Sequence, residues 1–146
     1  LTFKLKKMRE RNPDWSNALL NIHDVDGAYT VLQSDSGKVF MLSSTGGACE
    51  ITLPVAANLQ EGWNCKFVVK EDTPTGVITI AAGSAIIDMV MKDSGANASN
   101  STAGTAKSNI LIRAAAKQGD VVNVFTDGST YYAEALSSTD DSIDFS

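Results

Sequence analysis

The chain has 146 residues, 43% of them hydrophobic and 20% charged, and a formal net charge of −5. That length and composition indicate one globular unit with enough chain to bury a core. The acidic balance argues against nucleic acid as the main partner, because phosphates repel an acidic surface. No apolar run approaches the ~20 residues of a membrane-spanning helix, and the basic start has no apolar stretch typical of a secretory signal. We therefore expect neither nucleic acid nor a membrane as a partner.

The first 22 residues differ in pattern from the rest, so we expect a basic N-terminal arm with a short helix over 1–22 and a β-domain over 23–146. Asn12, Pro13 and Asp14 are typical of a helix start, with a capping side chain, a proline at the first helical position and an acid in the first turn. The apolar side chains that follow recur at spacings of three and four: Trp15, Ala18, Leu19 and Ile22. A helix this short is marginal alone, so it must pack on the core or on a partner.

Charge is distributed unevenly between the two ends of the chain. Basic residues crowd the arm, whereas the C-terminal segment from Glu134 onward contains acids and no base. Either both termini are simply solvated by their charge, or the arm docks on an acidic neighbour at a rate that falls with salt. We favour docking, because an isolated chain gains little by exposing the apolar side chains of the arm. The expected contact residues are Phe3, Lys4, Leu5, Lys6, Lys7, Met8, Arg9, Arg11, Trp15 and Trp63. For Trp63 a place in the core or at a sheet edge is slightly favoured over a contact.

From residue 28 onward, short segments rich in β-branched and aromatic residues alternate with turn signals, which predicts strands. The expected strands cover residues 28–32, 39–42, 51–53, 67–69, 77–80, 86–91, 109–115, 121–125 and 130–135. Asp127-Gly128 is the best hairpin signal, and Ile143 and Phe145, alternating with acids, favour a short edge strand at the tail. About nine short, evenly spaced strands predict an all-β protein, an antiparallel β-sandwich or jelly roll, with a small barrel as the alternative.

The residues that could carry chemistry do not form a recognisable site. Asp24, Asp26 and Gly27 match part of a calcium loop, but the alternating acids and the distant Glu of a full loop are missing, so a turn is expected. His23 is the only histidine, and no nucleophile elbow accompanies it. Cys49 and Cys65 lack zinc-site spacing, and we expect two free thiols, with a disulfide as the alternative. We expect no catalytic residue, metal or cofactor.

The longest irregular stretch is the small, polar segment 92–107, which is expected to be a solvent-facing loop at an exposed rim or a subunit contact. Asn97 and Asn100 each begin a glycosylation-type triplet, which counts only in a secretory pathway that nothing in the sequence supports.

Several of these turn-and-strand motifs together resemble a known class of protein. They are Gly37-Lys38 with Phe40, the run from Ile51 to Pro54, the run from Glu61 to Val69, the run from Gly119 to Val122, and the segment from Phe125 to Tyr132. In this succession residues 28–146 are similar to the capsid decoration, or cement, proteins of tailed bacteriophages of the marine and cyanophage type. The resemblance implies a β-sandwich subunit, a homotrimer, that bridges major capsid proteins on the outer surface of the virion. It would be assembled in the host cytoplasm, would resist the pressure of packaged DNA, and carries no catalytic residue.

Two other classes of function stay open at this point. A phage tail, baseplate or fibre component would be expected to show repeats or heptads if it formed a shaft, and the sequence shows neither. A carbohydrate-binding module, or an enzyme, would need exposed aromatics or ionisable groups gathered near one loop cluster. Tyr131 and Tyr132 alternate across a strand, so at most one of them faces any given surface.

Overall fold

The structure is a computed structural model that describes residues 21–72, 74–93 and 106–146. The arm contacts expected between Phe3 and Trp15, the helix expected to start at Asn12, and the glycosylation-type triplets lie outside these described residues. Within the described part of the chain, there is no helix with the length and hydropathy needed to cross a membrane.

Ten strands make up nearly all of the regular structure in the described residues. They are β1 (Asn21–Asp26), β2 (Tyr29–Thr30), β3 (Lys38–Ser43), β4 (Cys49–Thr52), β5 (Asn64–Val69), β6 (Ile78–Asp93), β7 (Ala106–Ile112), β8 (Val121–Thr126), β9 (Tyr131–Ser137) and β10 (Ile143–Phe145). Two short 3-10 turns, Gln33–Asp35 and Ala56–Asn58, form corners between strands. The expected hairpin at Asp127-Gly128 and the edge strand at the tail are confirmed.

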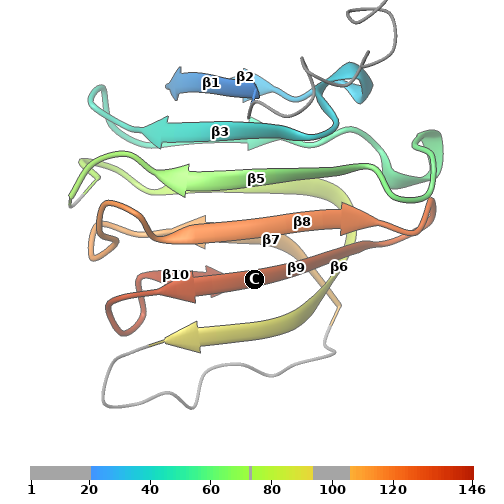
Figure 1. Cartoon of the computed structure of the whole chain (residues 1–146). Coiled ribbons are helices and arrows are strands. Elements are labelled where there is room, and N and C mark those ends of the chain that lie inside the picture. The colour runs from blue at the N-terminus through green and yellow to red at the C-terminus, as the bar shows by residue number, and fades with distance from the viewer. Residues whose placement is uncertain (1–20, 73, 94–105) are drawn as a thin grey trace, which may run out of the picture.

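The strands form two layers that face each other across one core, which confirms the all-β sandwich (Figure 1). Layer A has the order β1-β3-β5-β8-β9. Layer B has the order β2-β4-β6-β7-β10. The long strand β6 belongs to layer B at its start and continues into layer A, where its second half pairs with β9.

The expectation of purely antiparallel pairing is wrong. Of the nine strand pairs in the described residues, five are parallel. Four of the five arise because the first six strands alternate between the layers, so each strand lies beside the one two steps earlier and runs the same way. The fifth joins the second half of β6 to β9. The turns at Gly46-Gly47 and Glu61-Gly62 therefore join one layer to the other. They do not reverse the chain within a sheet, and a turn signal in the sequence does not distinguish these two geometries.

Strand β6 also differs from the expectation of two strands separated by Gly83-Ser84. It is one strand of 16 residues, and its pairing with β7 shifts register between Ala81 and Ile86. Gly83 lies in this interval with φ +62°, a left-handed conformation that glycine adopts without a steric penalty. The glycine therefore marks the bend by which β6 passes from layer B into layer A.

Strand β1 occupies residues that were expected to end a helix and begin a turn. Ile22, expected on the apolar face of that helix, is a strand residue with 58% of its surface exposed. His23 points inward and Val25 is buried, so the alternation of a half-buried strand decides this segment. The pairing of β1 with β3 supplies the backbone hydrogen bonds that a short helix would have made for itself.

The core lies between the layers and is built from the side chains that each strand points inward. In layer B, Ile51, Ile80 and Ile110 are cross-strand neighbours, and all three are fully buried. In layer A, the rings of Phe40 and Phe67 stack with centroids 5.3 Å apart. Each such side chain contributes about 1.5–3 kcal/mol of burial free energy, so these rows fix the registers of both sheets.

Candidate functional site

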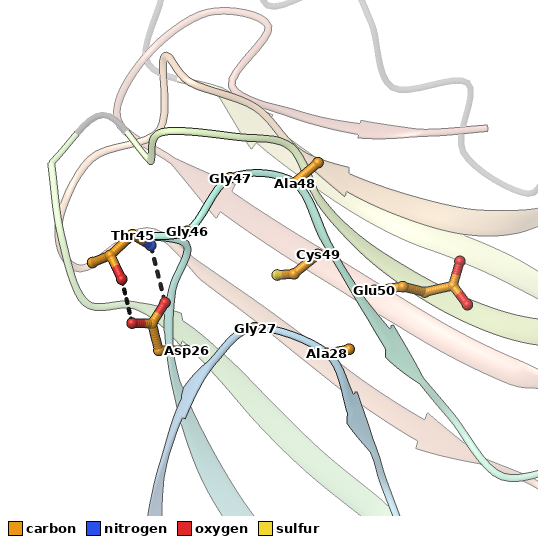
Figure 2. A pocket seen from close by; sticks show the side chains of 9 residues that line it. All are labelled: Asp26, Gly27, Ala28, Thr45, Gly46, Gly47, Ala48, Cys49 and Glu50. Atoms are coloured by element: carbon orange, nitrogen blue, oxygen red, sulfur yellow. Dashed lines mark hydrogen bonds between the residues drawn. The ribbon is translucent and has the colours of Figure 1, made fainter.

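A shallow depression of about 360 Å³ lies at one end of the sandwich, between the β1–β2 turn and the β3–β4 turn (Figure 2). Its lining residues come from two runs, 26–28 and 45–50. Asp26 closes one side: its carboxylate accepts hydrogen bonds from the backbone N–H of Thr45, at 2.9 Å, and from the Thr45 hydroxyl. The rest of the lining is formed by three glycines and by Ala28, Ala48, Cys49 and Glu50.

The ionisable groups of this depression do not form an acid–base pair. The hydrogen bonds from the Thr45 hydroxyl and backbone N–H lower the pKa of Asp26, so its carboxylate is fully charged and serves to join the two turns. Burial raises the pKa of the Cys49 thiol, which keeps it protonated and therefore a poor nucleophile. Figure 2 shows the Glu50 carboxylate pointing away from the Asp26–Thr45 pair. The Asp26–Thr45 hydrogen bonds join the β1–β2 turn to the β3–β4 turn.

The residues that matched part of a calcium loop are engaged by other side chains. Asp24 forms a salt bridge with Lys70, with 2.9 Å between Oδ1 and Nζ, and Asp26 binds Thr45. The described residues contain no group of three or more His, Cys, Asp or Glu side chains placed to hold a metal ion.

His23 and the two cysteines pack as parts of the sandwich. The His23 ring lies 5.0 Å from the Tyr29 ring and 5.8 Å from the Phe40 ring, between centroids, in an aromatic cluster at the β1 side of the core. Cys49 and Cys65 are free thiols, as expected. Cys65 is buried, and burial raises the pKa of its thiol far above the usual range.

Trp63 is a core residue, which corrects its inclusion among the expected contact residues. Only 5% of its surface is exposed, and its indole N–H donates a hydrogen bond to the carbonyl of Gln33 at 2.9 Å. Its ring also meets that of Tyr131 edge-on, with centroids 6.1 Å apart. An indole that is packed and hydrogen-bonded on the inside is not available as an anchor for a partner.

The outer faces of the two layers differ in chemistry, and this contrast is the most informative feature of the described surface. The outer face of layer B is mainly polar. Glu50, Thr79, Leu111 and Asp144 form one row across its strands, and Thr52, Ala81 and Asn109 form another. Arg113 adds a salt bridge to Asp144 at 3.0 Å. These polar and charged side chains are readily solvated.

The outer face of layer A carries two cross-strand rows and an aromatic pair. Cross-strand registers define an aliphatic row (Met41, Val68, Val121 and Leu136), a polar row (Lys66, Asn123 and Glu134) and an aromatic pair (Phe125 and Tyr132). Leu136 is 45% exposed and Phe125 is 39% exposed. The rings of the aromatic pair stack with centroids 5.2 Å apart. Beside them the face is hollowed by a depression of about 250 Å³ between β3, β5 and β8.

Sequence reasoning missed the aliphatic row because its four members are far apart in the chain. Each strand shows its own alternation, and the outward position of Val68 or Val121 could be inferred from that alternation alone. The row exists only because β3, β5, β8 and β9 are neighbours in registers that the sequence does not specify.

Comparison with known proteins does not identify a family for this chain. No protein-family model matches the chain, and no curated protein matches it.

Proposed function

We propose that this protein is a structural subunit that decorates and cements the outer surface of a tailed-phage capsid, without enzymatic activity. The observation that carries the proposal is the contrast between the outer faces of the sandwich. Layer B presents a polar face, while layer A leaves an aliphatic row and an aromatic pair partly exposed. A protein whose role is to cover neighbouring subunits needs apolar surface that becomes buried on assembly.

The chemistry of the described depressions supports the same proposal. Asp26 is committed to Thr45, and the Cys49 thiol is held protonated by its raised pKa. A reaction centre would instead bring groups with complementary pKa shifts within hydrogen-bonding distance of one substrate position. The resemblance of residues 28–146 to cement proteins supports the specific assignment to the capsid.

The N-terminal arm is the proposed attachment to the major capsid protein. Five of the 12 Lys and Arg residues lie in its first eleven positions, so an acidic groove on the shell would attract it over a Debye length of about 8 Å. Phe3, Leu5 and Met8 would then be buried against the shell. The arm joins the sandwich at β1, the edge strand of layer A. From the resemblance, the copies would form a homotrimer on the outer capsid surface.

The test is binding of the purified chain to empty, expanded capsids of the encoding phage, observed by cosedimentation and electron microscopy. The full chain is expected to add density at discrete positions on the outer shell. A variant lacking residues 1–14 should keep the β-sandwich circular dichroism signal but lose attachment. A length-matched control with Lys4, Lys6 and Lys7 replaced by Gln should bind more weakly and with less dependence on salt.

Two results would reject parts of this proposal separately. If the truncated chain decorated capsids at full occupancy, the docking role of the arm would be wrong. If the full chain left no density on the shell at saturating concentration, the capsid assignment itself would be wrong, and a tail or fibre position would be examined in the same micrographs.

A further inference from the structure

We infer that the outer face of layer A is a two-fold contact between two copies of this chain. The inference goes beyond the capsid proposal, because it concerns association of the free protein in solution. It rests on the polar row, the aliphatic row and their order across the sheet. Both rows include the neighbouring strands β5, β8 and β9, with β8 in the middle, and the aliphatic row also includes Met41 on β3.

The polar row is complementary to itself when its order is reversed. Lys66 on β5 and Glu134 on β9 lie on opposite sides of Asn123 on β8. Asn123 Nδ2 donates a hydrogen bond to Glu134 Oε1 at 2.9 Å, and no described residue forms a salt bridge with either Lys66 or Glu134. A second copy with the reversed order presents its Glu134 to Lys66, and its Lys66 to Glu134. The contact therefore contains two identical ion pairs.

A two-fold axis parallel to β8, lying in the plane between the faces, produces this reversal. It exchanges the positions of β5 and β9 and leaves β8 opposite the second copy's β8. The aliphatic row then matches by the same operation, because Val121 on β8 meets Val121 of the other copy, and Val68 meets Leu136. Aligned sheets pack about 30° apart, so the match is best along β8 and loosens toward the edges of the layer.

The area of the face is sufficient for a modest affinity. The five strands that face counterparts across an axis along β8 are β3, β5, β8, β9 and the second half of β6. With about six residues each, spacings of about 4.8 Å and rises of about 3.3 Å, they make a face of roughly 24 by 20 Å. Two such faces cover about 1,000 Å² in total before side-chain relief is counted, near the lower limit of about 1,200 Å² for specific stable interfaces. The contact should therefore be weak to moderate in solution and should weaken with salt because of its ion pairs.

The order of charged residues on layer B differs from that on layer A, which is why we assign the contact to layer A. The corresponding row of layer B places Glu50 and Asp144 at its two sides with Thr79 and Leu111 between them. Reversal of that row places Glu50 opposite Asp144 of the other copy, whose charge is already paired with Arg113, so the row gains no ion pair. Among the described residues, layer A alone places an acid and a base without a salt bridge at the two sides of one row.

The test is sedimentation equilibrium and light scattering of the full chain across a range of concentrations. Masses of two or six copies at high concentration support the two-fold contact, six being trimers joined in pairs. A mass of one copy throughout, or of three copies only, overturns it.

Charge swaps at exposed positions make the test specific to the proposed pairing. Lys66→Glu alone and Glu134→Lys alone should each weaken dimerisation about tenfold or more, because each creates two like-charge contacts. The double variant should restore it to within about threefold of the wild type. Restoration requires the pairing between copies, since within one chain the two side chains are separated by a whole strand. If both single variants dimerised weakly and the double variant did not restore dimerisation, the inference would be overturned.

A matched pair of substitutions checks the aliphatic row. Val121→Lys lies on the proposed axis and should abolish dimerisation, because the two new cations face each other. Leu111→Lys changes a similar half-buried outward residue on layer B and should leave dimerisation unchanged. Equal effects of the two variants would overturn the assignment to layer A. A dimer that survives Val121→Lys but disappears when residues 1–14 are removed would show that the arm occupies the contact, and would also overturn it.

Discussion

The hydroxyl of Tyr131 donates a hydrogen bond to the carbonyl of Pro54 at 2.5 Å, joining β9 of layer A to the segment that follows β4 of layer B. Tyr131 is fully buried, and burial raises the pKa of its phenol, so the proton that makes this bond stays in place throughout the physiological range. The two residues are 77 positions apart in the chain. The bond is thus a cross-layer contact inside the core.

Removing this hydroxyl should destabilise the sandwich without unfolding it. Tyr131→Phe keeps the packing of the ring but leaves the Pro54 carbonyl without its donor, and should lower the free energy of unfolding by about 1–2 kcal/mol. Tyr132→Phe is the neighbouring control, because its hydroxyl binds Asp127 at 3.2 Å in an exposed position. That variant should change stability by less than about 0.5 kcal/mol in urea titrations. Equal losses would contradict the cross-layer role.

Asp35 should make the stability of the protein depend on pH in the acid range. It is 2% exposed and accepts hydrogen bonds from Lys38 Nζ at 2.6 Å and from the backbone N–H of Leu32 at 2.8 Å. Burial raises the pKa of Asp35, but these hydrogen bonds outweigh it and the net shift is downward. A lowered pKa stabilises the fold above the unfolded-state pKa of about 3.9, and this stability is lost as pH falls through the folded-state value.

Asp35→Asn should therefore be less stable than the wild type at pH 7, by about 2–3 kcal/mol, with a smaller loss on going from pH 5 to pH 3. Asp24→Asn serves as the control. Its salt bridge to Lys70 joins side chains that are 66% and 48% exposed, so its removal should cost less than about 0.5 kcal/mol. Thermal unfolding at three pH values measures both. Parallel pH profiles for Asp35→Asn and the wild type would contradict the assignment.

Gly76 is required by close approach of two backbone segments. A Cβ at this position would lie 2.1 Å from the backbone nitrogen of Ala48, which cannot move without displacing the β3–β4 turn. Gly76→Ala should destabilise the fold by about 2–4 kcal/mol. Gly46→Ala is the control. Gly46 lies in the β3–β4 turn that Gly76 approaches, but nothing lies within 4 Å of its Cβ position. Differential scanning calorimetry should show a large shift in Tm for the first variant and almost none for the second.

Gly83 is required by backbone conformation, since its Cβ position is open space. Its φ of +62° costs about 1–2 kcal/mol for most residues and less for Asn. Gly83→Asn should therefore retain more stability than Gly83→Val, although Asn carries the more polar side chain into a strand. Urea midpoints in the reverse order would show that β6 bends elsewhere.

The two thiols should differ in reactivity in the folded protein. Burial raises the pKa of both Cys49 and Cys65, and Cys65 is also enclosed in the core. Iodoacetamide followed by mass spectrometry should modify Cys49 slowly, at a rate still rising above pH 9, and Cys65 only when the chain unfolds. Modification of Cys65 at the rate of a free thiol in native buffer would contradict its burial.

The sequence by itself determined the class of the fold and most of its strands. Alternating short segments bounded by Gly, Asn and Asp predicted β3, β8 and β9 closely and the second half of β5, because strand formation there follows local alternation and turn chemistry. The same local rules indicated that the two cysteines are free thiols. These local rules could not distinguish a hairpin from a connection between layers, since both use the same turn residues. They also did not predict β1.

Only the tertiary structure decided which strands are neighbours and in which register. Parallel pairing, the passage of β6 between layers through Gly83, and the burial of Trp63 all follow from contacts between residues distant in the chain. The rows on the outer face of layer A have the same origin. Lys66, Asn123 and Glu134 become neighbours because the buried side chains of their strands fit the core in one register, and one-residue shifts would turn those side chains outward.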